Sequence, residues 1–272
     1  MTRKLKNIRV IATKITGGLH KQKNTPCQDF YHYACSGNKL VAVVSDGAGS
    51  AKYGKIGAKV VCETIVNVLI NTPLKDVEEG VKKAIEMARA KLVIHRLNKS
   101  KSEKEILNFS ATVVGVIYHK NKGMFFHIGD GAGIALDGEN IKSEYTISPP
   151  HNGTFSCETY FYTMNNWKDS LRFTRIPKSS SLFLMTDGVT GFAIDENNCE
   201  LKESFLEPIN KYLRDEPNKI KALKALNNTL DTKQARKLNS DDKTFLWVGL
   251  WVKLKICNIM RFLQIDILKE LS

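Results

Sequence analysis

Four aspartates stand where an apolar, strand-like run meets a turn. They are Asp46 in VVSDGAGS, Asp130 in FHIGDGAG, Asp187 in LFLMTDGVTG and Asp241 in NSDDKTFLWV. A glycine follows each of the first three, which permits a sharp turn and leaves the main-chain carbonyl approachable. Hard cations such as Mg²⁺ and Mn²⁺ prefer several oxygen ligands of this kind. Two such ions about 3.5–4 Å apart can hold a bridging hydroxide in line with a phosphorus atom, so the pattern indicates metal-assisted phosphate chemistry.

The same residues also have a purely structural interpretation, because Asp-Gly is a common turn dipeptide. For one such pair the turn would be the better explanation. Three pairs at the ends of apolar runs, together with Asp241-Asp242 directly before a further strand, are less easily explained by turns alone. The spacing therefore favours a metal site without establishing it.

The elements that must position these acids follow from the hydrophobic periodicity. Apolar runs predict strands at 39–45, 110–119, 123–128, 133–137, 159–163, 171–176, 182–186 and 244–252, and helical spacing predicts helices at 56–69, 77–92, 201–213 and 220–230. Residues 138–158 contain two prolines, two glycines and two asparagines, and we expect a loop there. Because the strands are grouped rather than alternating with helices, the order predicts antiparallel sheets with helices on their outer faces.

The composition is that of a globular chain with a basic surface. Its 272 residues carry a formal net charge of +13, but the lysines are spread thinly and no basic motif is interleaved with aromatic residues. We therefore expect a solvated lysine-rich surface rather than a nucleic-acid site. The run at 245–252 is too short to span a bilayer and no apolar segment opens the chain, so we expect a cytoplasmic protein with no membrane contact.

Two further features concern the tail and the cysteines. Residues 253–272 have the spacing of an amphipathic helix, with apolar positions at 256, 259, 260, 263, 267 and 268. We expect this tail to pack on a single catalytic domain formed by residues 1–252. The six cysteines form no C-x-x-C pair, which favours buried free thiols over a zinc cluster or a disulfide framework.

Seven segments together carry a resemblance to a known family. In chain order they are GGLHKQKNTPCQDFY, VAVVSDGAGSAKYGKIGA, FSATVVG, IGDGAG, NGTFSCETYF, MTDGVTGF and SDDKTFLWV, extending over roughly residues 17–252. This series resembles the metal-dependent serine/threonine phosphatases of the protein phosphatase 2C family, and most closely its bacterial branch. The resemblance implies an α+β fold, a four-layer α/β/β/α sandwich with two antiparallel sheets flanked by helices.

The resemblance also implies an activity and its partners. The chain would be a phosphoserine/phosphothreonine protein phosphatase in which a metal-bridged hydroxide attacks the phosphate monoester. It would use two Mg²⁺ or Mn²⁺ ions, with a third in some bacterial relatives. Its partners would be a phosphorylated protein substrate and the pathway of a cognate serine/threonine kinase.

Roles for individual residues are carried over from the family motifs. By similarity, Asp46 would bridge both metals, Gly47 would ligate one through its carbonyl, and Asp187 and Asp241 would complete the ligands of the other. These three aspartates, Asp46, Asp187 and Asp241, would be the catalytic set. By the same similarity, Asp29 would act through ordered water and Asp130 would help to hold a third ion.

The chain departs from the family pattern at three places. Asp242 replaces an asparagine, which leaves open whether Asp241 or Asp242 is the ligand. Ala48 stands where many members have a histidine proposed as general acid, so either water on a metal or His20 would have to supply the proton. Lysines 21 and 23 stand near the place of a phosphate-gripping arginine, and a lysine offers a point charge without bidentate geometry.

Other functions fit the sequence less well. The stretch Gly49–Lys55 nearly spells a P-loop, but Ile56 follows where a hydroxyl should meet Mg²⁺. A haloacid-dehalogenase-type phosphatase needs an acid at Met185, and a thiol phosphatase needs an arginine-containing loop after Cys27. The main alternative is a catalytically weak, phosphatase-like module that binds phosphoproteins or a ligand in a regulatory role.

Overall fold

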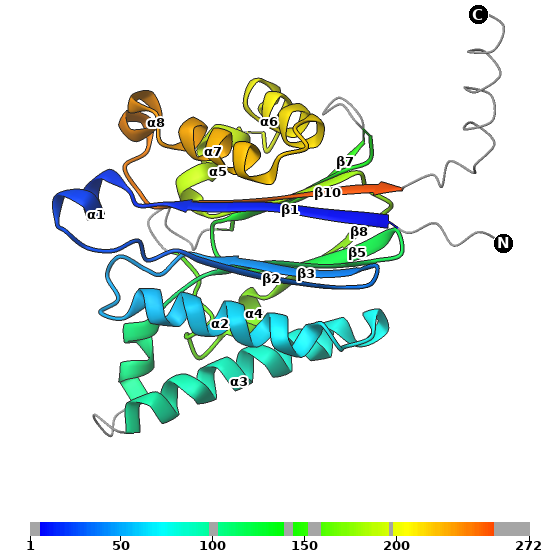
Figure 1. Ribbon diagram of the computed structural model, residues 1–272. Coiled ribbons are helices and arrows are strands. Elements are labelled where there is room, and N and C mark those ends of the chain that lie inside the picture. Colours follow the sequence, from blue (N-terminus) through cyan, green and yellow to red (C-terminus); the bar gives the residue numbers. More distant parts are fainter. Residues whose placement is uncertain (1–5, 98–102, 139–143, 152–158, 196–197, 253–272) are drawn as a thin grey trace, which may run out of the picture.

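The computed structural model describes residues 6–97, 103–138, 144–151, 159–195 and 198–252. Two five-stranded antiparallel sheets lie face to face, and helices cover both outer faces (Figure 1). One sheet has the order β1 (Lys6–Ile15), β10 (Lys243–Val252), β9 (Ser181–Met185), β6 (Ala132–Leu136) and β7 (Tyr145–Ser148); the other has the order β2 (Phe30–Ser36), β3 (Lys39–Ser45), β4 (Val113–His119), β5 (Lys122–Ile128) and β8 (Arg172–Ile176). The four-layer sandwich is confirmed.

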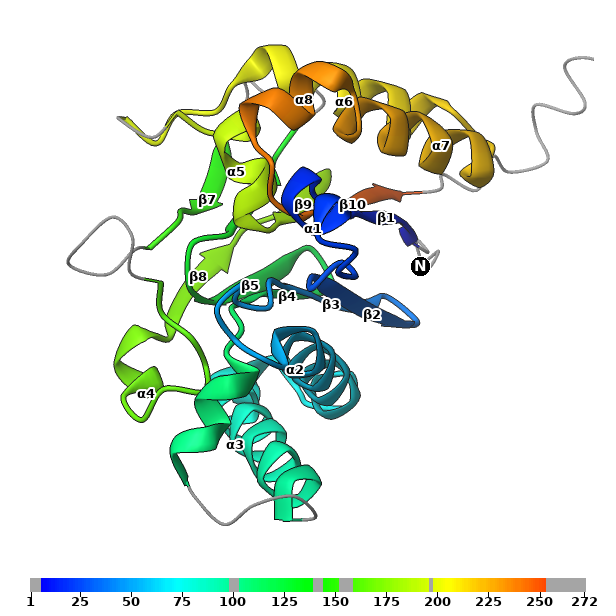
Figure 2. The same cartoon turned by 90° about the vertical axis from the view of Figure 1, so that its left-hand side faces the viewer.

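The helices form the two outer layers. α2 (Gly54–Leu69) and α3 (Val77–Leu97) pack on the β2–β8 sheet, and α5 (Asp187–Ala193), α6 (Glu203–Asp215) and α7 (Lys219–Leu230) pack on the other (Figure 2). The short elements are α1 (Gly18–Gln22), α4 (Trp167–Ser170), α8 (Lys233–Leu238) and the 3₁₀ turns Leu74–Asp76 and Glu103–Phe109. No helix among the described residues is long and apolar enough to cross a bilayer.

β3 shows why the central strands read as unbroken apolar runs. Val41 and Val43 pack against α2 and α3, whereas Leu40, Ala42 and Val44 pack against the opposite sheet. Burial on both faces removes the polar alternation of a half-exposed strand. The polar residue that ends such a run, here Asp46, is therefore held at a fixed point on the edge of the sandwich.

Two element predictions were wrong, and one strand was missed. Residues 138–158 are not all loop, because Tyr145–Ser148 pairs with β6 as an edge strand. Residues 159–163 do not form a strand: they run as a bridge and turns, with the buried Tyr162 bonded to the carbonyl of Ala111. β2 was not predicted, because this edge strand is only partly buried and lacks a continuous apolar run. The predicted tail, 253–272, lies outside the described residues.

Candidate metal centre

The strand directions bring five acids to one end of the sandwich. Asp46 follows β3, Asp130 follows β5, and Asp29 precedes β2, whose start lies beside the end of β3. Asp187 begins α5 two residues after the end of β9, and Asp241 lies two residues before β10, which runs antiparallel to β9. All five therefore lie at the end where α1 lies in Figure 1, which faces the viewer in Figure 2.

Asp29 is the most deeply placed of these acids. It is fully buried, one carboxylate oxygen accepts a 2.8 Å hydrogen bond from the Thr186 hydroxyl, and the other has no hydrogen-bond partner. Burial raises its pKa to about 6, although the hydrogen bond from Thr186 acts in the opposite direction. A carboxylate oxygen left unpaired in the interior is costly unless a cation or water satisfies it.

The acids also raise one another's pKa values. The pKa of Asp46 is raised well above its usual value by burial and then by the charges of Asp29 and Asp187. The pKa of Asp187 is raised by burial and then by the charges of Asp130, Asp241 and Asp29. Like charges gathered in a region of low dielectric disfavour ionisation, and a divalent cation removes that penalty.

Asp130 lies at the edge of this cluster. The Thr159 hydroxyl donates a 2.6 Å hydrogen bond to one of its oxygens, while the other is buried without a partner. Within the described residues no three His, Cys, Asp or Glu side chains form a compact ligand cluster. The link between the five acids is thus electrostatic proximity at one edge, and their oxygen donors match the preference of Mg²⁺ or Mn²⁺.

The structure separates the roles of Asp241 and Asp242. Asp242 is buried, and its carboxylate accepts hydrogen bonds from the backbone N–H groups of Gly17 (2.7 Å) and Gln28 (2.6 Å) and from His20 Nδ1 (2.8 Å). These three bonds tie α1 and the start of β2 to β10. Asp241 is exposed, and its charge raises the pKa values of Asp46, Asp130 and Asp187, whereas the charge of Asp242 acts on Asp29. The geometry therefore favours Asp241 as the ligand and gives Asp242 an anchoring role.

The loop that carries these two acids is held from both sides. The buried Lys243 donates from Nζ to the carbonyls of Asn239 (2.6 Å) and Asp241 (3.0 Å). On the other side, a Cβ atom at Gly188 would lie 1.8 Å from the carbonyl oxygen of Asp242. Glycine follows Asp187 because two backbones meet there, rather than because the chain turns sharply as we expected.

Gln28 is the site residue that sequence reasoning missed. Its side-chain amide nitrogen lies 2.7 Å from the carbonyl oxygen of Gly47 and 3.1 Å from that of Ala48, and donates to both. The carbonyl oxygen of Gly47, which we expect to ligate a metal ion, thus already accepts a hydrogen bond. Adjacency to Asp29 was the available signal, because neighbouring residues at a strand start reach the same edge of the sheet.

The remaining sequence candidates are placed as follows. Lys21 pairs with Asp231 at 3.2 Å, near α8, and so makes a structural contact of its own. Cys27 is buried, and burial together with the charges of Asp29 and Asp242 raises the pKa of its thiol. A thiol kept protonated is a poor nucleophile, which argues against a thiol-phosphatase mechanism.

Three solved structures share this fold. A bacterial serine phosphatase is 15% identical, with a TM-score of 0.64 over 91% of this chain and 100% of its own. The serine/threonine phosphatase Stp1 from Staphylococcus aureus is 15% identical, with a TM-score of 0.62 over 89% of this chain and 95% of its own. The catalytic domain of the serine/threonine phosphatase PstP, in complex with two manganese ions, is 14% identical, with a TM-score of 0.60 over 90% of this chain and 99% of its own. No match was found among curated proteins.

The fold is thus the one found in bacterial serine and serine/threonine phosphatases. A family model described as "Protein phosphatase 2C" matches residues 16–233. The chain belongs to the protein phosphatase 2C family and is a protein serine/threonine phosphatase. The matched region contains Asp29, Asp46, Asp130 and Asp187 and ends before Asp241.

Proposed function

We propose that this chain hydrolyses phosphoserine and phosphothreonine in proteins by a metal-dependent mechanism centred on Asp46. The observation that carries the proposal is the convergence of mutually repelling acids, most of them buried or partly buried, at one end of the sandwich. Keeping such groups together is unfavourable unless cations bind. Two of the fold neighbours were solved with manganese or magnesium, which supports divalent cations here.

In this proposal Asp46, Asp187 and Asp241 hold the ions, with the Gly47 carbonyl as a further donor. The bound cations would supply an activated water and neutralise the charge that develops on the phosphoryl oxygens. Asp29 supports the site from the interior, because its carboxylate accepts a hydrogen bond from Thr186 and its charge acts on Asp46. Asp130 extends the acid cluster toward Thr159 and would help to hold a third ion.

Gln28 has a specific part in this arrangement. Its backbone N–H is fixed by Asp242, and its side chain reaches the carbonyl of Gly47. For the carbonyl to ligate an ion, the amide must share or release that oxygen, which has two lone pairs. Gln28 thereby connects the anchoring carboxylate of Asp242 to the metal side of the site.

A second function rests on two departures from the family pattern. Ala48 supplies no proton, and Lys21 is paired with Asp231. These features favour a phosphatase-like module that binds a phosphoprotein or ligand with weak turnover.

A titration with Mn²⁺ separates the two functions. Protein freed of metal by chelation receives increasing Mn²⁺, and hydrolysis of an aryl phosphate is measured at each step. Turnover that rises with Mn²⁺ and falls by about 10²-fold or more in Asp46→Asn supports the enzyme. Metal binding without turnover supports the module.

A further inference from the structure

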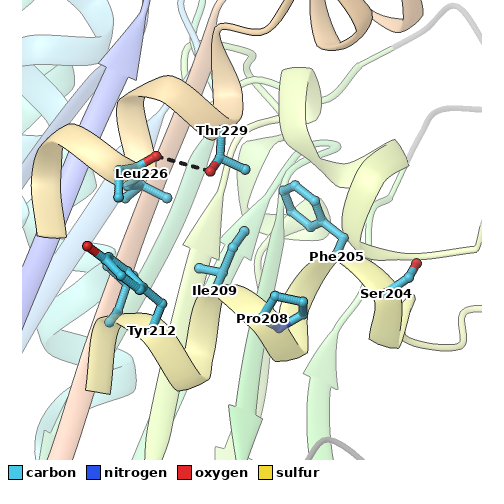
Figure 3. A pocket seen from close by; sticks show the side chains of 9 residues that line it. Ser204, Phe205, Pro208, Ile209, Tyr212, Leu226 and Thr229 are labelled. Atoms are coloured by element: carbon cyan, nitrogen blue, oxygen red, sulfur yellow. Dashed lines mark hydrogen bonds between the residues drawn. The ribbon is translucent and has the colours of Figure 1, made fainter. Parts of the chain in front are cut away.

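An apolar groove runs between α6 and α7 on the outer face of the molecule, about 350 Å³ in volume (Figure 3). Phe205, Ile209 and Tyr212 of α6 face Leu226 and Thr229 of α7. Tyr212 is 44% exposed, although it stands in a mainly apolar lining. None of these residues belongs to the acid cluster, so the proposed reaction does not explain the groove.

The end of the described chain lies next to this groove. Arg214, near the end of α6, donates from Nη2 to the hydroxyl of Ser181 at 3.1 Å. Ser181 is the cross-strand partner of Gly249 in β10, and Leu250 donates its backbone N–H to the carbonyl of Ser180. The last residues of β10 therefore lie beside the C-terminal end of α6, where Tyr212 lines the groove. The chain continues from this point for twenty residues, 253–272.

That continuation has the pattern and the length to fill the groove. The apolar residues at 256, 259, 260, 263 and 267 share one face of a helix. Twenty helical residues measure about 30 Å, compared with about 20 Å for the thirteen of α6. A segment that leaves β10 and turns back along α6 is therefore long enough to run the full length of the groove.

We propose that residues 253–272 dock as an amphipathic helix in the groove between α6 and α7 of the same chain. The segment then adds a helix to the outer layer over the β1–β10 side of the sandwich. Its apolar face covers Phe205, Ile209 and Leu226.

Hydrogen–deuterium exchange on the full chain tests the docking. We compare wild type with Tyr212→Glu, which places a charge in the groove, and with the control Tyr145→Glu, whose tyrosine on β7 is 41% exposed and lies outside the groove. We expect amides of 256–268 to be protected in wild type and to exchange about tenfold faster or more in Tyr212→Glu, but not in the control. Leu263→Asp should expose amides of 204–213 in return.

Three results would overturn the proposal. The first is unprotected exchange of 256–268 in wild type. The second is equal exchange in the Tyr212 and Tyr145 variants. The third is protection that depends on protein concentration and accompanies a dimeric mass, because a second copy would then occupy the groove. Protection gained only with anionic vesicles, and insensitive to Tyr212→Glu, would make the segment a membrane-binding element and would equally contradict docking.

Discussion

Replacing Asp29 by asparagine should stabilise the metal-free protein at pH 8. Burial raises the pKa of the folded Asp29 carboxyl from its ordinary 3.8 to about 6. A raised folded pKa means that the folded protein holds the proton more tightly than the unfolded chain. Stability is therefore lost as the pH rises from about 4 through 6 and stays low above that. Asparagine carries no charge and still offers an oxygen to the Thr186 hydroxyl.

The size of the effect follows from the shift. About two pKa units at 1.36 kcal/mol each give roughly 3 kcal/mol. For a chain of this size that corresponds to a rise in Tm of about 6–10 °C. Thermal unfolding in the presence of chelator at pH 8 should show the higher Tm of Asp29→Asn, and the difference in Tm between the variant and wild type should narrow toward pH 4. Added Mn²⁺ should stabilise wild type more than the variant.

Asp231→Asn is the matched control for this experiment. Hydrogen bonds from Arg236 lower the pKa of the partly exposed Asp231, so its neutralisation should leave stability unchanged or slightly reduced. The reasoning is refuted if Asp29→Asn is no more stable than wild type at pH 8 in chelator, or if Asp231→Asn shows the same gain.

Three further predictions concern turnover. Asp241→Ala should abolish Mn²⁺-dependent activity, whereas Asp242→Asn, which keeps one acceptor oxygen for the Gly17 N–H that ties α1, should retain much more of it; the reverse would make Asp242 the ligand. His20→Ala should slow phosphothreonine and aryl phosphate hydrolysis by a similar, modest factor, and a selective loss of about 10²-fold or more on phosphothreonine would make His20 the general acid. Acidic phosphopeptides should react faster than basic ones at low salt, with a preference that fades as salt is added; equal rates would show that net charge is irrelevant.

The sequence predicted those parts of the site that depend on local pattern. Asp46 and Asp187 end strands that are apolar throughout because both faces are buried, and such runs can be recognised without a partner. The antiparallel grouping then predicts that acids at strand ends meet at one edge. Strands β2 and β7 were missed because they are edge strands whose half-exposed residues give no continuous apolar run.

What the sequence could not predict depends on long-range contacts. The bonds from Gly17, His20 and Gln28 to the carboxylate of Asp242 join residues more than two hundred positions apart. The need for glycine at 188 arises from the backbone of Asp242, which no local pattern contains. Pairing of Lys21 with Asp231 likewise depends on where α8 begins. These contacts give Asp242, Gly188 and Lys21 structural roles that differ from those inferred from their spacing in the sequence.

Hydrolysis of a phosphothreonine peptide with and without Mn²⁺ tests the central claim most directly. Protein freed of metal by chelation and returned to chelator-free buffer should be inactive, and stoichiometric addition of Mn²⁺ or Mg²⁺ should restore turnover in wild type but not in Asp46→Asn. Full activity in metal-free buffer, or equal activity of wild type and Asp46→Asn after metal addition, would contradict a mechanism built on the acid cluster at the end of the sandwich.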